Sequence, residues 1–285
     1  MRARAPASSA NLGPGFDVLA LAVDLYVEVE VEPATKLIVR SEGEGSEFAG
    51  DASHLAAQVA MEVKGHDRLA VTVRSSIPVA RGLGSSAALA VAAAAAAGSS
   101  DPLGAGIQVD GHPENAAASV HGGLVAAALV KGQVRVVRFP FDEALAVVAA
   151  IPEQAVSTKR ARTLLPDMIP RRDATFNLGR MALLLAGLGD RRLLDRESCA
   201  DRLHQDYRNP LLPKAPMILN AMIEGGGLGA CWSGAGPTLI AMCDRGNAAQ
   251  VASAAVAAMK EASVRGEVRV LQPDMRGLLA GDDLD

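Results

Sequence analysis

A glycine-rich stretch beginning at residue 78 has the residue types and spacing to bind phosphate. It reads PVARGLGSSAALAV and continues into an alanine run, with two glycines just ahead of two serines: Gly82, Gly84, Ser85 and Ser86. The pattern predicts a loop leading into a helix that ends near Gly98. The N-terminus of such a helix offers unpaired N–H groups and the positive end of the dipole, which suit a phosphate. The same residues are also typical of an ordinary helix capped by serine. Neither of the common phosphate-loop patterns, Gly-Lys-Ser/Thr and Gly-x-Gly-x-x-Gly, is present.

Other segments bring polar side chains to turns or helix starts. NLGPGFD at residues 11–17 predicts a turn, although a plain loop between strands has the same composition. In STKRARTLLP at residues 157–166, Thr158 and Arg162 are four residues apart, which places them on one face of a helical turn. The fork of an arginine pairs bidentately with a carboxylate, so Arg162 suits an acidic ligand, whereas Lys159 and Arg160 fit a solvated helix end.

The stretch PVARGLGSSAA resembles the phosphate-binding signature of the GHMP kinases, the superfamily of galactokinase, homoserine, mevalonate and phosphomevalonate kinases. The glycine-rich turn SGAGPT at residues 233–238 resembles the third motif of that superfamily. The resemblance implies that ATP is bound through the first stretch. The residues expected at its phosphates are Pro78, Arg81, Gly82, Leu83, Gly84, Ser85 and Ser86.

Three further motifs resemble those of homoserine kinases. SANLGPGFD at residues 9–17 is similar to their N-terminal signature, DGHPEN at residues 110–115 to EGHPDN, and STKRARTLLP to their Ser-Thr-x-x-Ala-Arg-x-x-Leu-Pro pattern. The resemblance implies catalytic roles for Asp17, Thr158 and Arg162, and a magnesium ion held by Asp110 and Ser85. The substrate-binding residues that it implies are Asn11, Asp17, Asn115, Arg162, Arg208, Gly234 and Gly236. Whether Asp17 takes the hydroxyl proton or orients it stays open.

The sequence departs from the homoserine kinase pattern at four places. Ala20 stands where glycine is usual, Asp110 replaces glutamate, Glu114 replaces aspartate, and the Ser/Gly/Pro-rich residues 99–106 are expected to be a loop where a regular helix is usual. His112, His121 and Arg202 are expected to be structural. Two alternatives therefore stay open: another GHMP-type small-molecule kinase, or a nucleotide-binding homologue with weakened catalysis.

Periodicity predicts mixed elements that must position these motifs. Alternation predicts strands in the first half at residues 23–31, 37–41 and 69–74, a helix at 53–64 capped by Ser53, and a hairpin at 124–139 that turns at Lys131-Gly132. In the second half we expect strands at 146–151, 228–233, 237–243 and 266–271, helices at 175–188, 191–204, 214–224 and 247–262, and a frayed acidic tail, Asp282–Asp285.

The fold expected from these elements and from the resemblance is α+β with two lobes. Residues 1–143 would form an N-terminal ribosomal-protein-S5-like mixed lobe that binds ATP, and residues 144–285 a C-terminal ferredoxin-like lobe. The implied reaction is phosphorylation of the side-chain hydroxyl of L-homoserine by ATP with Mg²⁺, a step toward threonine. The family also suggests a homodimer.

Composition excludes several other classes of partner. Of the 285 residues, 49% are apolar and 3% aromatic, and the net charge is −4, which disfavours nucleic acid as a partner. Three widely spaced cysteines, Cys199, Cys231 and Cys243, point to a reducing cytosol. Asp17 and Asp24 interrupt the segment after the N-terminal arginines, so we expect no signal peptide, no membrane association and a cytoplasmic protein.

Overall fold

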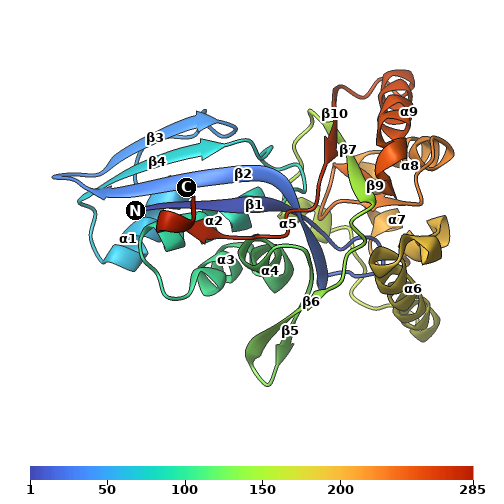
Figure 1. Ribbon diagram of the computed structural model, residues 1–285, viewed down its shortest axis with the longest axis horizontal. Helices are drawn as coiled ribbons and strands as arrows, with labels where there is room; N and C mark the ends of the chain where they lie inside the picture. Colours follow the sequence, from blue (N-terminus) through green and yellow to red (C-terminus); the bar gives the residue numbers. More distant parts are fainter. Residues whose placement is uncertain (285) are drawn as a thin grey trace.

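The computed structural model describes residues 1–284 and shows an α+β protein with two sheets side by side (Figure 1). The expected α+β class is confirmed, and helices cover each sheet. Asp285, the last residue of the expected acidic tail, lies outside the described residues. Residues 281–284 form a short 3₁₀ helix, so the expectation of a frayed tail is wrong for the part that is described.

The first sheet has the strand order β11–β1–β2–β4–β3, with β5 added to β2 and β6 to β5. All its pairings are antiparallel except β3–β4. On β2, Val27, Val29 and Val31 are buried while the glutamates between them are partly exposed, so alternation sets which face meets the core. The strands are β1 (Arg2–Ala10), β2 (Leu19–Pro33), β3 (Ile38–Gly43), β4 (Leu69–Ser75), β5 (Leu124–Val130), β6 (Gln133–Phe139) and β11 (Leu279–Ala280).

Four helices lie along one face of this sheet (Figure 1). They are α1 (Leu55–Lys64), α2 (Ser85–Ala96), α3 (Pro102–Asp110) and α4 (Pro113–His121). Helix α2 is the central one and contacts β1, β2 and the other three helices. Its side chains from Ala90 to Ala96 are all buried, because small residues let the neighbouring elements approach from every side.

The second sheet is antiparallel, with the order β10–β7–β9–β8. Its strands are β7 (Leu145–Pro152), β8 (Gly229–Trp232), β9 (Leu239–Asp244) and β10 (Gly266–Leu271). Helices α8 (Ala215–Glu224) and α9 (Ala248–Glu261) pack against it. Strand β7 is buried throughout, since alternate side chains belong to two different hydrophobic clusters, and this explains its unbroken apolar sequence.

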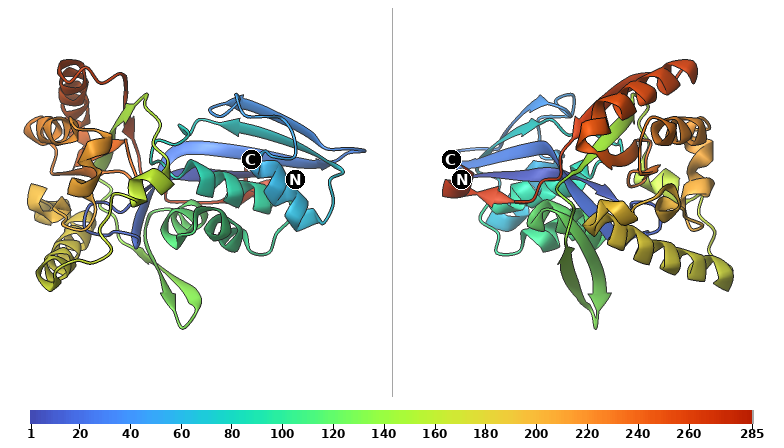
Figure 2. Two further views of the ribbon diagram at one scale, coloured as in Figure 1. Left: turned by 180° about the vertical axis from the view of Figure 1, so that it is seen from behind. Right: turned by 45° about the vertical axis from the view of Figure 1, so that its right-hand side comes forward.

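The remaining helices α5 (Thr158–Arg162), α6 (Arg171–Gly189) and α7 (Gln205–Arg208) belong to the segment between β7 and α8. After β10 the chain returns to the first lobe (Figure 2), where β11 pairs with β1. Along this return Tyr26 Oη donates to Asp274 Oδ2 (2.9 Å). The division of the chain at residue 143 stays a prediction. In residues 1–284, no helix is both long and apolar enough to cross a membrane.

Residues 99–106 were expected to be a loop, and this is wrong, because α3 begins at Pro102. Asp101 caps the helix by accepting from the backbone N–H of Gly104 (2.8 Å), and proline is well tolerated at a first helical position. Gly106 is not a helix breaker here but a contact point. A Cβ at Gly106 would lie 2.7 Å from Ala116 Cβ and 2.8 Å from Val91 Cγ2, so the glycine lets α3 pack closely on α2 and α4.

Two other local expectations fail because side chains bond the backbone differently. The expected helix at 191–204 is replaced by 3₁₀ turns at Arg191–Leu193 and Arg196–Cys199, since the Asp190 and Asp195 carboxylates accept from backbone N–H groups and compete with helical bonds. Helix α1 is capped by His54, whose Nδ1 accepts from Ala56 N (3.2 Å), and not by Ser53.

Candidate active site

A cavity of about 640 Å³ opens between the two lobes, and most of the residues predicted from the sequence line it. These are Asn11, Asp17, Arg81, Gly82, Leu83, Gly84, Ser85, Ser86, Asp110, Asn115, Thr158, Arg162, Arg208, Gly234 and Gly236. Pro78 lines a smaller hollow beside it. Segments far apart in the sequence therefore meet at one site, as their motifs implied.

The glycine-rich loop is shaped by close backbone packing. Gly82 and Gly84 both have positive φ, and a Cβ on Gly82 would lie 2.3 Å from Ser233 O, so a side chain fits neither the conformation nor the space. Gly84 is the N-cap of α2 and supplies no side-chain acceptor. The N-cap residue therefore makes no side-chain bond to the first N–H groups of α2, and these adjoin the cavity that Ser85 and Ser86 line.

The Arg81 guanidinium donates hydrogen bonds to three backbone carbonyl groups. Its Nη1 donates to Val79 O (2.7 Å), its Nε to Pro152 O (2.9 Å) and its Nη2 to Glu153 O. These bonds tie the loop to the end of β7 in the second lobe. The side chain thus braces the loop, whereas the sequence alone suggested a direct phosphate contact.

Asp110 lies at the C-terminal end of α3 beside the start of α2. Ser86 Oγ donates to its Oδ1, and Asn115 Nδ2 donates to its Oδ2 (3.3 Å), while Ser85 lines the cavity nearby. Burial raises the pKa of Asp110, against the opposing effect of these hydrogen bonds. A cation beside the carboxylate would offset that desolvation.

These oxygen donors fit a magnesium ion. Mg²⁺ prefers hard oxygen ligands and usually takes only one or two protein carboxylates, with phosphates and water completing its shell. The described residues hold no cluster of three or more histidine, cysteine or acidic side chains arranged for a metal, so an all-protein cage is not offered. One carboxylate with neighbouring hydroxyls suits an ion that is shared with a nucleotide.

The far end of the cavity is built from the Asn11–Asp17 loop and the turn at Gly234. Asn11 Nδ2 donates to Gly234 O (2.9 Å), and its Oδ1 accepts from Asp17 N (2.9 Å). Both Asn11 and Asp17 have positive φ, which small polar residues tolerate better than most. On the other side of the turn a Cβ on Gly236 would lie 2.4 Å from the Trp232 ring, so this glycine is required for space.

Asp17 and Arg162 form a bidentate ion pair across the lobes. Arg162 Nη2 lies 2.6 Å from Asp17 Oδ1, and Nη1 lies 3.1 Å from Oδ2. Helix α5 positions the arginine, and Ser157 caps that helix by accepting from Arg160 N. Thr158, the first residue of α5, also lines the cavity, so the expected proximity of Thr158 and Arg162 is found.

Arg208, at the end of α7, is buried to 2% exposure. Its Nη1 donates to Gly234 O (2.6 Å), and its Nε has no hydrogen-bond partner in residues 1–284; the same is true of Arg162 Nε. Burial, and then the neighbouring Arg162, lower the pKa of Arg208 to about 10. Two guanidinium groups with buried, unpaired donors therefore adjoin the cavity and suit an anionic group.

Glu114 is a site residue to which the sequence analysis gave no role. It is 3% exposed, lines the cavity, and its Oε2 has no hydrogen-bond partner in the described part of the chain. Burial raises its pKa to about 7, and the nearby Asp17 and Asp110 add to the effect. The signal available in the sequence was its place between Pro113 and Asn115 in the DGHPEN motif.

Fold and site together define a class of protein, and comparison with known proteins agrees. The model for the N-terminal domain of GHMP kinases matches residues 51–123, and that for their C-terminal domain matches residues 182–261. A structure of L. major mevalonate kinase in complex with R-mevalonate superimposes with a TM-score of 0.74 over 99% of this chain and 97% of that one, at 16% identity, which shows the fold alone. The protein has the GHMP kinase fold.

Proteins with higher sequence identity show which family within this class the chain belongs to. The homoserine kinase of Moorella thermoacetica is 39% identical over 96% of this chain and 97% of its own length, and that of Thermus thermophilus is 39% identical over 86% and 88%. The crystal structure of homoserine kinase from Cytophaga hutchinsonii superimposes with a TM-score of 0.85 over 98% and 96% of the two chains, at 26% identity. The chain belongs to the homoserine kinase family, whose members are small-molecule kinases.

Proposed function

We propose that this protein transfers the terminal phosphoryl group of ATP to the side-chain hydroxyl of L-homoserine, which yields O-phospho-L-homoserine and ADP, a step toward threonine. One observation carries the proposal. A single cavity contains both a helix N-terminus suited to phosphate and a set of charged side chains suited to an amino acid, namely Arg162, Arg208, Asp17 and Glu114. Membership of the homoserine kinase family supports the same substrate.

ATP fits the cavity with its phosphates at the loop before α2. Its base would lie at an apolar end of the cavity, away from the end that the Asn11–Asp17 loop and the Gly234 turn build. The apolar end is lined by Val27, Phe48, Leu55 and Val73, and such surfaces accept a flat heterocycle. The N–H groups at the start of α2 would stabilise the negative charge of the phosphates, and Arg81 would hold the loop in place.

Asp110, with Ser86 and Ser85 beside it, would hold the magnesium ion. When bound, such an ion neutralises charge on the phosphate oxygens of a nucleotide. The short hydrogen bond from Ser86 to Asp110 places one serine hydroxyl against the carboxylate, so the aspartate, although shorter than the usual glutamate, stays in reach of the loop.

L-Homoserine fits the other end through its two charged groups. We assign its carboxylate to Arg208 and Arg162, whose Nε donors have no partner in the described part of the chain, and its ammonium group to Glu114. Asn11, Asn115 and the glycine turn would complete the wall around it. The side-chain hydroxyl would then point toward Thr158 and the phosphates.

The ammonium group also distinguishes homoserine from mevalonate, the substrate of a same-class alternative. Mevalonate has a carboxylate but no cation, so Glu114 would stay buried and unpaired beside it, which costs free energy. This argument favours an amino acid over a hydroxy acid.

Phosphoryl transfer needs mainly positioning and charge stabilisation, because its transition state is loose. Both carboxylate oxygens of Asp17 accept from Arg162, so we infer that Asp17 orients this arginine and the substrate rather than acting as a strong base. Both lobes contribute side chains to the wall of the cavity, so a bound substrate would lie between them.

The test is ADP release by the purified protein with ATP and Mg²⁺, with L-homoserine compared against mevalonate, L-serine and galactose. We expect homoserine-dependent turnover that falls by at least about a hundredfold in kcat/KM in Asp110→Ala and Arg208→Ala. Arg202→Ala is the matched control, because Arg202 pairs with Asp173 and packs on Phe176 away from the cavity. Turnover of another compound alone would reject the substrate, and ATP binding without turnover of any compound would favour the weakened homologue.

We also propose that the protein is a cytoplasmic homodimer. The three cysteines are buried and free, as expected for a reducing compartment. Helix α6 exposes an apolar face that contains Leu178 and Leu183, and an antiparallel copy of the helix would place Arg172 near the negative C-terminal end of its partner. The residues exposed on this face are Thr175, Leu178, Gly179, Ala182, Leu183 and Ala186.

A further inference from the structure

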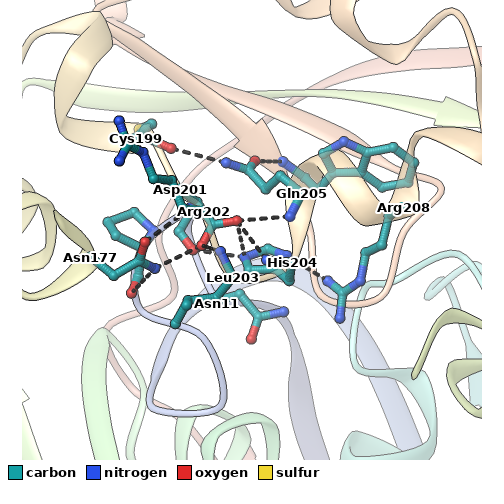
Figure 3. Close-up of polar contacts among 12 residues, drawn as sticks. Asn11, Asn177, Cys199, Asp201, Arg202, Leu203, His204, Gln205 and Arg208 are labelled. Carbon is teal, nitrogen blue, oxygen red and sulfur yellow. Dashed lines mark hydrogen bonds and ion pairs between the residues drawn. The ribbon is translucent and has the colours of Figure 1, made fainter. Parts of the chain in front are cut away.

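A buried polar cluster surrounds the start of α7 and includes Asp201, His204 and Arg208 (Figure 3). The Asp201 carboxylate is fully engaged by the protein. Its Oδ1 accepts from Asn177 Nδ2 (2.7 Å) and Leu203 N (2.9 Å), and its Oδ2 accepts from the backbone N–H groups of His204 (2.9 Å) and Gln205 (2.7 Å). Asp201 therefore shapes the turn that presents His204 and is not free to bind a ligand.

The contacts of His204 define one tautomer of its ring. Nε2 lies 2.7 Å from the carbonyl oxygen of Gly13, which can only accept, so Nε2 carries the proton. Nδ1 lies 2.8 Å from Arg208 Nη1, which can only donate, so Nδ1 is unprotonated. Burial lowers the pKa of His204 to about 4, which is consistent with a neutral ring.

This tautomer holds one edge of the Arg208 guanidinium. Nη1 donates to both His204 Nδ1 and Gly234 O, while Arg208 Nε has no partner within residues 1–284 and the side chain lines the cavity. His204 also stacks on Phe16 (ring centroids 5.1 Å apart), and Arg208 lies 5.6 Å from the same ring. The arginine is thus fixed between a histidine, a carbonyl group and an aromatic face, with its unpaired donor left for a ligand.

We propose that His204 is a positioning residue for the substrate: by accepting a hydrogen bond from Arg208 it fixes the guanidinium in the orientation that binds the substrate carboxylate. The inference rests on the proposed function, in which Arg208 binds that carboxylate. Because Gly13 holds the Nε2–H end of the ring, the same residue links the Asn11–Asp17 loop of the first lobe to α7 of the second.

Three substitutions separate the two bonds of His204. His204→Phe removes both and keeps an aromatic ring against Phe16, whereas His204→Asn keeps an acceptor near the Nδ1 position and His204→Gln keeps a donor near the Nε2 position. We expect His204→Phe to raise the KM for homoserine by about tenfold with a much smaller change in kcat and in the KM for ATP. His204→Asn should recover most of this loss and His204→Gln should not.

The control for lost stability is Ser119→Ala, which removes a buried hydrogen bond to Pro6 O outside the cavity. It should lower the thermal midpoint and leave the KM for homoserine unchanged. Equal homoserine KM values for folded His204→Asn and His204→Phe, or rescue by His204→Gln instead, would overturn the proposal. In Arg208→Lys, His204→Phe should have little further effect on that KM, because the two residues act through one contact.

A second measurement does not depend on the substrate. In protein with ¹⁵N-labelled histidine, the His204 signals, assigned by their loss in His204→Phe, should show a protonated Nε2 and an unprotonated Nδ1 at pH 7, and the Nδ1 signal should shift in Arg208→Lys. A protonated Nδ1, or no shift, would overturn the proposal even if homoserine is turned over. If homoserine is not turned over, the proposed function fails, and these ring signals alone decide whether His204 positions Arg208.

Discussion

At the scale of single residues, the cavity contains several ionisable side chains whose burial disfavours their charged forms and so lowers the stability of the folded protein. Glu114, Asp110 and Arg208 are all shifted toward their neutral forms, in each case mainly by burial. Such shifts are typical of sites that bind charged ligands, because the ligand supplies the missing partner. The cost of leaving these groups unpaired is therefore measurable in the protein without ligands.

Glu114→Gln should change how stability depends on pH. An unfolded Glu114 ionises near 4.5 and the folded one near 7, so its favourable contribution is present below 4.5 and is lost as the pH rises through 7. Glutamine has no such dependence. The free energy of unfolding of the variant, relative to that of the wild type, should therefore rise by about 3 kcal/mol from pH 4.5 to pH 8. The measurement is urea unfolding at each pH without Mg²⁺ or ATP.

Glu47→Gln is the matched control for this measurement, since Glu47 is exposed. Its stability curve should run parallel to that of the wild type across the same pH range. A parallel curve for Glu114→Gln as well would show that Glu114 is not buried in its charged form in solution.

At the scale of elements, small residues let the helices under the first sheet approach each other and place Asp110 beside the phosphate loop. Helix α3 is the clearest case, because it packs on α2 and α4 through Gly106 and ends at Asp110. The glycine that suggested a loop from the sequence is the residue that permits this packing. Helix position, and not only helix formation, decides where the candidate magnesium ligand lies.

Gly106→Ala tests this packing. Alanine improves helix propensity by about 1 kcal/mol, but its Cβ would overlap Ala116 and Val91, and overpacking costs about 1–3 kcal/mol. Backbone atoms of α3 must then move, so we expect net destabilisation, together with weaker Mg²⁺-dependent ATP binding as Asp110 shifts. Gly189→Ala in α6 is the control, because its Cβ would meet nothing closer than 3.8 Å. Stabilisation by both changes would contradict the close contact.

At the scale of the whole molecule, the two lobes are joined by polar contacts at the cavity and by the returning C-terminal segment. Asn11, Asp17 and Gly13 of the first lobe bond Gly234, Arg162 and His204 of the second, respectively. A substrate that bridges these groups therefore favours one arrangement of the lobes. None of the residues on the exposed face of α6 lines the cavity, so assembly through that face would not use the residues of the site.

The proposed dimer is tested by Leu178→Glu combined with Leu183→Glu, which places like charges on the exposed α6 face. The wild type should sediment at twice the mass of the 29.3 kDa chain, and the variant at the mass of one chain. Leu129→Glu, on the exposed β5–β6 hairpin, is the control. Dissociation by Leu129→Glu instead would place the interface on the hairpin, and a monomeric wild type would reject the dimer.

The sequence by itself determined much of the local structure and the membership of the site. Alternation located β2 and β4, an unbroken apolar run located β7, and the small residues after Gly84 located α2. Most of the residues that the motifs singled out line the cavity. These features depend on backbone preferences and on the period of apolar residues, which a short stretch of sequence encodes.

Tertiary structure decided which partner each side chain has. It placed Ser86 against Asp110, used Arg81 to brace the loop, left Glu114 Oε2 buried with no hydrogen-bond partner in residues 1–284, and held His204 between Gly13 and Arg208. It also turned the glycine-rich residues before Asp110 into a packed helix. The physical reason is that these outcomes depend on contacts between segments distant in the sequence, such as Asp17 and Arg162, and on the burial that only the assembled lobes create.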